Sequence, residues 1–75
     1  MSTVSYVVFL FESVSAVLVA EKVLKDMGIP HKLIPVPKQL SSDCGVCLRV
    51  ESDDQLRVEQ ALADKVKVLT IHPLS

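Results

Sequence analysis

The stretch "VSYVVFLF", residues 4–11, decides the fold of this chain. It is short, β-branched and aromatic, which is typical of a strand rather than a helix. Successive side chains of a strand point to opposite faces of the sheet, and both sets are apolar here. The two sets are Tyr6, Val8 and Leu10, and Val7, Phe9 and Phe11. We therefore expect a central strand in which the helices cover one set of side chains, while the other set is exposed to solvent in a monomer.

Two further segments follow this strand. Ser13 is a suitable N-cap for a helix over residues 14–27, which Gly28 can end. Residues 31–36, "HKLIPV", predict a second strand, and Pro35 with Pro37 stops it or confines it to a sheet edge.

The second half of the chain repeats the alternation of strands and helix after a loop at residues 37–45. "VCLRV", residues 46–50, predicts a third strand, with Cys47 and Arg49 on the face away from Leu48. Ser52 and Gln55 then have the spacing of a capping box for a second helix that runs to about residue 64. Residues 66–72, "VKVLTIH", predict the last strand.

The order of these elements predicts one α+β domain over residues 1–75, with the ferredoxin-like β-α-β-β-α-β pattern. We expect a four-stranded antiparallel sheet in the order 4-1-3-2, with both helices on one face. The predicted first helix is more apolar than one buried stripe requires. Val14, Leu18 and Val19 add to the core positions Val17, Ala20, Leu24 and Met27. This excess favours a homo-oligomer, although small domains also tolerate exposed aliphatic residues.

Composition excludes several classes of protein. The 75 residues are 49% hydrophobic with a net charge of -1, so intrinsic disorder is not expected. The basic residues are scattered, which argues against nucleic-acid binding. No window has the ~18 apolar residues of a membrane span, and the N-terminal segment lacks the features of a signal peptide. We therefore expect a cytoplasmic protein with no membrane contact, in which thiols stay reduced.

Both cysteines lie in "SSDCGVCLRV", residues 41–50, in a C-x-x-C spacing. A redox pair is disfavoured, because positions i and i+3 of a strand lie ~10 Å apart on opposite faces, whereas a disulfide needs about 4.4–6.8 Å. A zinc site needs four ligands, and the lone His31 and His72 fall on opposite edges of the expected sheet. We expect no metal site, and we interpret each histidine as a solvated strand-end residue.

A single working thiol, Cys44, remains as an interpretation of this loop. Gly45 permits a positive-φ turn, and the amides from Ser41 and Ser42 onward can form an anion-binding nest. Lys38 and Arg49 add positive charge that favours a thiolate, while Asp43 opposes it. Cys47 is best explained as a small packed residue on the sheet. On these residues alone, Cys44 can equally be a structural loop cysteine without chemistry.

Residues 20–50, "AEKVLKDMGIPHKLIPVPKQLSSDCGVCLRV", resemble the selenium/sulfur carrier-like family of small bacterial domains. The features that carry the resemblance are Ser13, Gly28, "LIPVP" at 33–37, "SSDCG" at 41–45 and Leu48-Arg49, so it covers nearly the whole chain. Cys47 departs from the family pattern, which has a small apolar residue there.

The resemblance implies a carrier of sulfur or selenium, held as a persulfide or selenopersulfide on Cys44, with Gly45 and Arg49 in support. It further implies a donor of the cysteine desulfurase type and an acceptor protein, without a cofactor. Cys47 could then act as a resolving thiol. Two alternatives stay open: a non-enzymatic interaction or regulatory module in which Cys44 is structural, and a thiol-disulfide protein that uses both cysteines.

Overall fold

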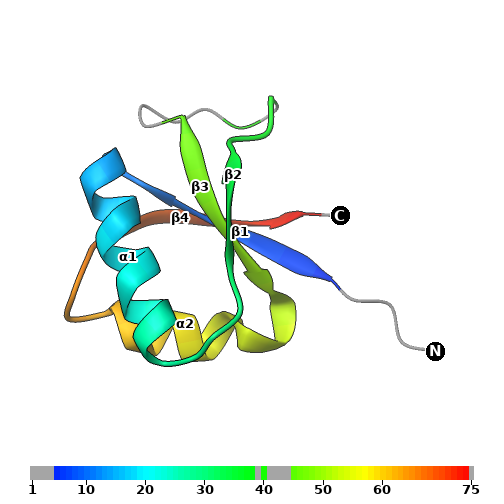
Figure 1. Cartoon of the computed structure of the whole chain (residues 1–75). Coiled ribbons are helices and arrows are strands. Elements are labelled where there is room, and N and C mark those ends of the chain that lie inside the picture. The colour runs from blue at the N-terminus through cyan, green and yellow to red at the C-terminus, as the bar shows by residue number, and fades with distance from the viewer. Residues whose placement is uncertain (1–4, 39, 41–44, 75) are drawn as a thin grey trace.

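A computed structural model describes residues 5–38, 40 and 45–74 of the chain (Figure 1). The described residues form an α+β fold. In chain order its elements are β1 (Tyr6–Phe11), α1 (Val14–Asp26), β2 (Lys32–Pro35), β3 (Val46–Glu51), the 3₁₀ turn η1 (Ser52–Asp54), α2 (Gln55–Leu62) and β4 (Val68–Leu74).

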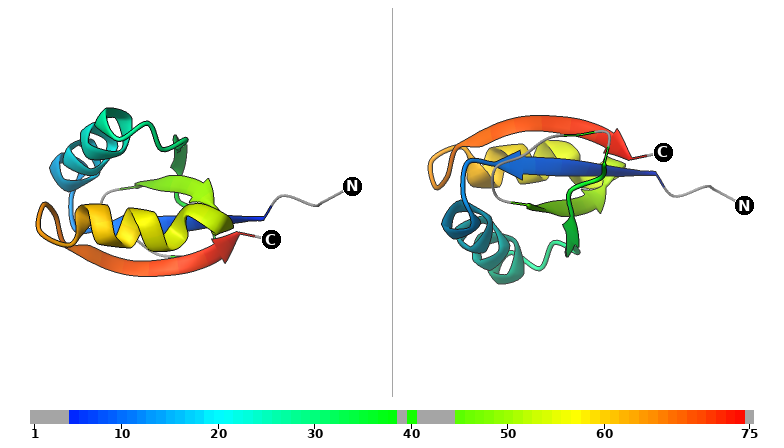
Figure 2. Two further views of the ribbon diagram at one scale, coloured as in Figure 1. Left: turned by 90° about the horizontal axis from the view of Figure 1, so that it is seen from below. Right: turned by 90° about the horizontal axis from the view of Figure 1, so that it is seen from above.

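The four strands form one sheet in the order β2-β3-β1-β4, and each neighbouring pair is antiparallel. Counted from the other edge, this is the expected order 4-1-3-2. β1 and β3 are the inner strands, and β2 and β4 are the edges, as the two end views in Figure 2 show. Pro35 and Pro73 both lie in edge strands, where a missing N–H is tolerated.

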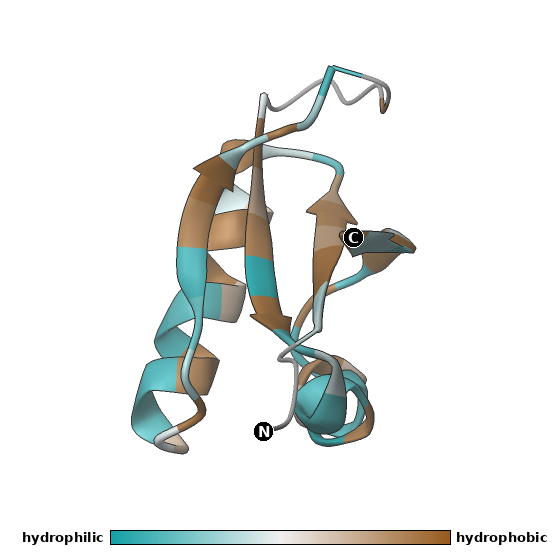
Figure 3. Cartoon of the chain, turned by 90° about the vertical axis from the view of Figure 1, so that its right-hand side faces the viewer, coloured by the Kyte–Doolittle hydropathy of each residue, from teal (hydrophilic) through white to brown (hydrophobic). Residues whose placement is uncertain are grey.

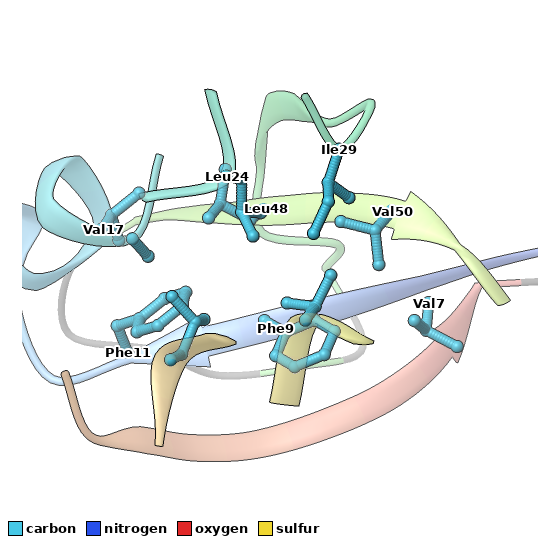
Figure 4. Close-up of a cluster of buried hydrophobic side chains, with 11 residues drawn as sticks. Val7, Phe9, Phe11, Val17, Leu24, Ile29, Leu48 and Val50 are labelled. Atoms are coloured by element: carbon cyan, nitrogen blue, oxygen red, sulfur yellow. The ribbon is translucent and has the colours of Figure 1, made fainter. Parts of the chain in front are cut away.

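Both helices pack on the face of the sheet that carries Val7, Phe9 and Phe11, so this is the set of β1 side chains that the helices cover (Figure 4). β3 contributes Leu48 and Val50 to the same cluster. The helices supply Val17, Ala20 and Leu24 from α1 and Val58 and Leu62 from α2, and Ile29, between α1 and β2, completes the cluster. The expectation of two helices on one face is therefore confirmed by the packing.

The opposite face of β1 is buried as well. Val8 is 0% exposed and Leu10 is 3% exposed, and together with Cys47 they form a second cluster. Leu40, from the connection between β2 and β3, and Leu74, at the end of β4, pack against this cluster. The expectation that these side chains would be wet in a monomer is wrong, because aliphatic residues outside the two inner strands cover them.

α1 begins and ends with the caps that its sequence predicts. The amide N–H of Ala16 donates to the Ser13 side-chain oxygen at 3.2 Å. At the other end Gly28 has φ +71°, and its N–H donates to the Lys25 carbonyl while that of Ile29 donates to the Leu24 carbonyl. This is a Schellman motif, and Leu24 and Ile29 share the core cluster that accompanies it.

The outer surface of α1 retains large apolar side chains in solvent. Val17, Ala20 and Leu24 are fully buried, as expected. Met27, which we assigned to the buried stripe, is 51% exposed, and that assignment is wrong because Met27 is the C-cap residue beyond the last packed turn. Val14, Leu18 and Val19 are each about half exposed.

Hydropathy colouring shows mainly apolar strands and helices of mixed character (Figure 3). Over the described residues, no helix is both long enough and apolar enough to cross a membrane.

The second half of the chain departs from prediction at two element ends. The Ser52 to Gln55 capping box does not form, because Ser52–Asp54 wind into a 3₁₀ turn and Gln55 becomes the first residue of α2. The Gln55 amide instead donates to Glu59 Oε2 at 3.1 Å. α2 ends at Leu62, whose carbonyl accepts from the Lys65 and Val66 amides, so β4 starts two residues later than predicted.

Candidate functional site

The connection between β2 and β3 carries the candidate thiol. Cys44, Ser41 and Ser42 lie outside the described residues, so the roles predicted for them stay predictions. The described residues around them are Lys38, which is exposed, and Leu40, which is half-buried. Figure 1 shows that the end of β2 and the start of β3, which this connection joins, lie at the same end of the sheet.

Backbone hydrogen bonds close the base of the connection. Pro35 is opposite Val46 in the ladder, and the Val36 N–H donates to the Gly45 carbonyl at 3.1 Å. Further along, the Leu40 N–H donates to the Pro37 carbonyl at 2.9 Å, which forms a turn. The position that follows Cys44 in the sequence is therefore held against β2.

Gly45 occupies the left-handed region with φ +75°, so the predicted positive-φ turn is confirmed. A Cβ built on this residue meets nothing within 4 Å, which shows that the need for glycine is conformational rather than steric. The chain enters β3 directly after this turn.

Arg49 lies farther along β3 than its predicted supporting role suggests. It lies four positions after Gly45, which is roughly 13 Å of extended strand. Its guanidinium carbon stacks over the Tyr6 ring, 4.2 Å from the centroid, and Tyr6 is opposite Glu51 in the β1–β3 ladder. The positive charge of Arg49 is thus anchored toward the end of β3 that leads into η1.

Cys47 is fully buried, with 0% exposure, on the face of the sheet away from the helices. It contacts the cluster of Val8 and Leu10, and Ile34 lies opposite it on β2. The interpretation of Cys47 as a small packed residue is confirmed. Its predicted role as a resolving thiol would require this face to open, because a buried sulfur cannot reach a disulfide on another group.

His31 is not the solvated strand-end residue that we expected. Its side chain is 14% exposed, and Nδ1 donates to the Ile29 carbonyl at 2.8 Å. Nε2 lies 4.0 Å from Glu21 Oε2 on α1. The expectation is wrong because residues 29–31 fold back under the end of α1 before β2 begins. Among the described residues, no group of three or more His, Cys, Asp or Glu side chains could hold a metal ion.

Tyr6 is the residue of this region that the sequence analysis missed. The two-residue periodicity left open which set of β1 side chains faces the helices, so it did not place Tyr6 on the same face as Arg49. Their contact also depends on the register, in which Val8 is opposite Arg49. Neither the pattern nor the strand order specifies that register, so the stack emerges only from the structure.

The comparisons with known proteins yield one match. A family model described as "Putative Se/S carrier protein-like" matches residues 6–73, nearly the whole chain. No curated protein and no solved structure matches. The match covers both helices, the first three strands, β4 up to Pro73 and the connection that bears Cys44.

Proposed function

Because this chain belongs to the Se/S carrier protein-like family, we propose that it carries sulfur or selenium as a persulfide or selenopersulfide on Cys44. The single observation that carries the proposal is the family match, which spans the connection in which Cys44 lies. The family description names a carrier and no residue, so the assignment to Cys44 is our own.

The environment of the second cysteine supports the choice of Cys44. A carrier thiol has to be reached by a donor and then by an acceptor, and Cys47 is sealed in an apolar cluster. Cys44 belongs to a connection whose base is closed by the Val36 to Gly45 hydrogen bond. Connections of this kind commonly present functional groups on a rigid scaffold.

The proposed transfer needs no oxidant and no cofactor. The Cys44 thiolate attacks the outer sulfur of a persulfide on the donor, a new sulfur–sulfur bond forms, and the donor bond breaks. The donor leaves as a thiolate. The transferred outer sulfur keeps its proton, so Cys44 ends as a persulfide. The acceptor repeats the exchange in the next step. A selenopersulfide follows the same balance with selenium as the transferred atom.

The partners in this proposal are a donor of the cysteine desulfurase type and an acceptor protein. The carrier would work in the cytoplasm, where a reducing environment keeps Cys44 available as a thiol. The carrier itself supplies no general base, since the attacking thiolate and the leaving thiolate have similar basicity.

Intact-mass analysis tests the proposal. The reduced protein is incubated with a cysteine desulfurase and cysteine or selenocysteine, and its mass is then measured without reductant. We expect a gain of one sulfur or one selenium atom that returns to the starting mass after reduction. The gain should disappear in Cys44→Ser, because the attacking thiolate is removed.

Cys47→Ala is the matched control for this experiment. It removes the other thiol but keeps a small apolar side chain in the buried cluster, so loading should be unchanged. Loading that persists in Cys44→Ser, or that is absent from the wild-type protein with every donor, would contradict the proposal. A mass loss of two hydrogen atoms on addition of a mild oxidant, which takes up the two electrons, would instead support a dithiol that closes to a disulfide.

We also propose that α1 is a contact surface for a second copy of the chain. Val14, Leu18 and Val19 keep about half of their surface in solvent, although they stand on a helix whose inner side is fully buried. The charged residues on α1 have both signs, Glu21 and Asp26 against Lys22 and Lys25, which suits a surface that meets its own copy. This contact is compatible with a carrier and with a pure interaction module.

A further inference from the structure

A small cavity lies where the end of β3 meets the segment that leads into β2. Its volume is about 120 Å³, which is room for a molecule of a few heavy atoms. Its lining is more polar than the rest of the interior. The lining residues are Tyr6, Pro30, His31, Arg49, Val50 and Glu51. All six lie in the described part of the chain, and none of them belongs to the connection that bears Cys44.

Arg49 enters this cavity with hydrogen-bonding capacity to spare. Its Nε is buried and has no acceptor within hydrogen-bond distance among the residues that the structure describes. Its guanidinium carbon lies over the Tyr6 ring, 4.2 Å from the centroid, which positions the group at the wall of the cavity. A buried donor without an acceptor is costly, so a bound acceptor would relieve that cost.

Glu51 gives the cavity a negative group beside the positive one. Arg49 and Glu51 are two residues apart in β3, so both project from the same face, and Tyr6 stands opposite Glu51. The ion pairs found among the described residues are His31 with Glu21 and Arg57 with Asp54, so Arg49 and Glu51 do not neutralise each other directly. The cavity therefore presents a separated cation and carboxylate.

His31 forms the fixed wall of the cavity. Its ring is held by the 2.8 Å hydrogen bond from Nδ1 to the Ile29 carbonyl. Nε2, on the other side of the ring, lies 4.0 Å from Glu21 Oε2 on α1. A bare anion in the cavity would meet the Glu51 carboxylate, whereas a ligand with its own positive group would be attracted by it.

From this pairing we propose that the cavity binds a free α-amino acid through its zwitterionic head group. Arg49 binds the α-carboxylate through the guanidinium edge, and Glu51 binds the α-ammonium. The volume suits an amino acid with a small side chain, such as alanine or serine. The site lies roughly 13 Å along β3 from Gly45, so it is separate from Cys44 and does not rest on the proposed carrier function.

Nuclear magnetic resonance of the ¹⁵N-labelled full chain tests this site. L-alanine, propionate and ethylamine are titrated separately at constant ionic strength and pH, so that the head group and its two halves are compared. We expect alanine to shift the amides of His31, Val50 and Glu51. Propionate and ethylamine should each bind at least about tenfold more weakly than alanine, because each ligand lacks one charge-assisted contact.

Charge-removing variants locate the contacts. Arg49→Gln and Glu51→Gln should each weaken alanine binding at least about tenfold. Arg49→Lys keeps the charge but loses the two-pronged guanidinium, so its affinity for alanine should lie between those of the wild type and Arg49→Gln. Lys32→Gln and Asp53→Asn are matched controls, since Lys32 stands opposite Arg49 on β2 and neither residue lines the cavity. Both controls should bind alanine as the wild type does.

Three results would overturn the proposal: no shift with alanine, equal binding of propionate and alanine, or undiminished binding in Glu51→Gln. The second and third would mark a simple anion site. If Arg49→Gln does not fold, the comparison of the three ligands and the Glu51 variant still decide. A negative result for alanine binding would not bear on the proposed loading of Cys44, because the two experiments have separate readouts.

Discussion

Cys47 illustrates how a single strand position determines the environment of a thiol. It follows Val46 in β3, and the alternation of the strand turns it away from the helices into the cluster of Val8 and Leu10. The residue pattern predicts this face correctly. The cover over the cluster comes from residues that are distant in sequence, because Leu74 at the end of β4 packs on it together with Ile34, Val36 and Leu40.

Alkylation of the Cys44→Ser variant tests the burial of Cys47 directly. Cys47 is then the remaining thiol, and we expect iodoacetamide to modify it at least about a hundredfold more slowly than free cysteine, because modification requires a local opening. Addition of urea should restore rapid labelling, measured by intact mass over time. Rapid labelling of the folded variant would show that this face opens readily and would revive a resolving role for Cys47.

α1 shows which element signals can be trusted from sequence. Its N-cap and its C-terminal glycine are local, since each depends on a few consecutive residues, and both form as predicted. The Ser52 to Gln55 capping box has an equally good spacing but fails, because η1 displaces Gln55 into the first position of α2. The Ser52 N–H donates to the Ser5 carbonyl at 2.8 Å, so the start of η1 is in contact with the residue that precedes β1.

Substitution of Ser13, the N-cap of α1, and of Ser15, inside α1, distinguishes the effect of capping from that of helix propensity. Ser13→Ala should destabilise the protein by about 1 kcal/mol, because the Ala16 amide loses its acceptor. Ser15→Ala, at an exposed position inside the helix, should be neutral or stabilising by a few tenths of a kcal/mol. Urea denaturation followed by circular dichroism measures both, and equal effects of the two substitutions would argue against the cap.

At the scale of the whole molecule, residues 7–11 of β1 are buried on both faces of the sheet. Among the described residues, the large apolar side chains left exposed are Val14, Leu18 and Val19 on α1, Met27 at its C-cap, and Leu33, Leu56 and Leu69 elsewhere. Two features of the sequence predict an oligomer: a sheet face exposed to solvent and a first helix with more apolar residues than one buried stripe needs. The first feature does not hold, because the aliphatic residues around Val8 and Leu10 seal that face. The second feature holds, so a subunit contact is best sought on the outer side of α1.

Leu18→Lys tests that contact, and Leu56→Lys is its control. Both leucines are largely in solvent, at 52% and 66% exposure, but Leu56 stands on α2. Leu18→Lys should weaken self-association at least about tenfold, because a buried leucine contributes about 1.5–3 kcal/mol, while Leu56→Lys should leave it unchanged. Sedimentation over a range of concentrations measures both, and a wild-type protein that stays monomeric throughout would refute the contact.

The element order, the alternation of faces in β3, the caps of α1 and the turn at Gly45 are all predictable from the sequence alone. These features depend on short-range periodicity and on backbone preferences, which neighbouring residues specify. Tertiary structure decided the start of α2, the shift of β4, the burial of His31, the cover over Cys47 and the stack of Arg49 on Tyr6. Each of these depends on register or on packing between distant segments, and a single-residue shift would change every such contact.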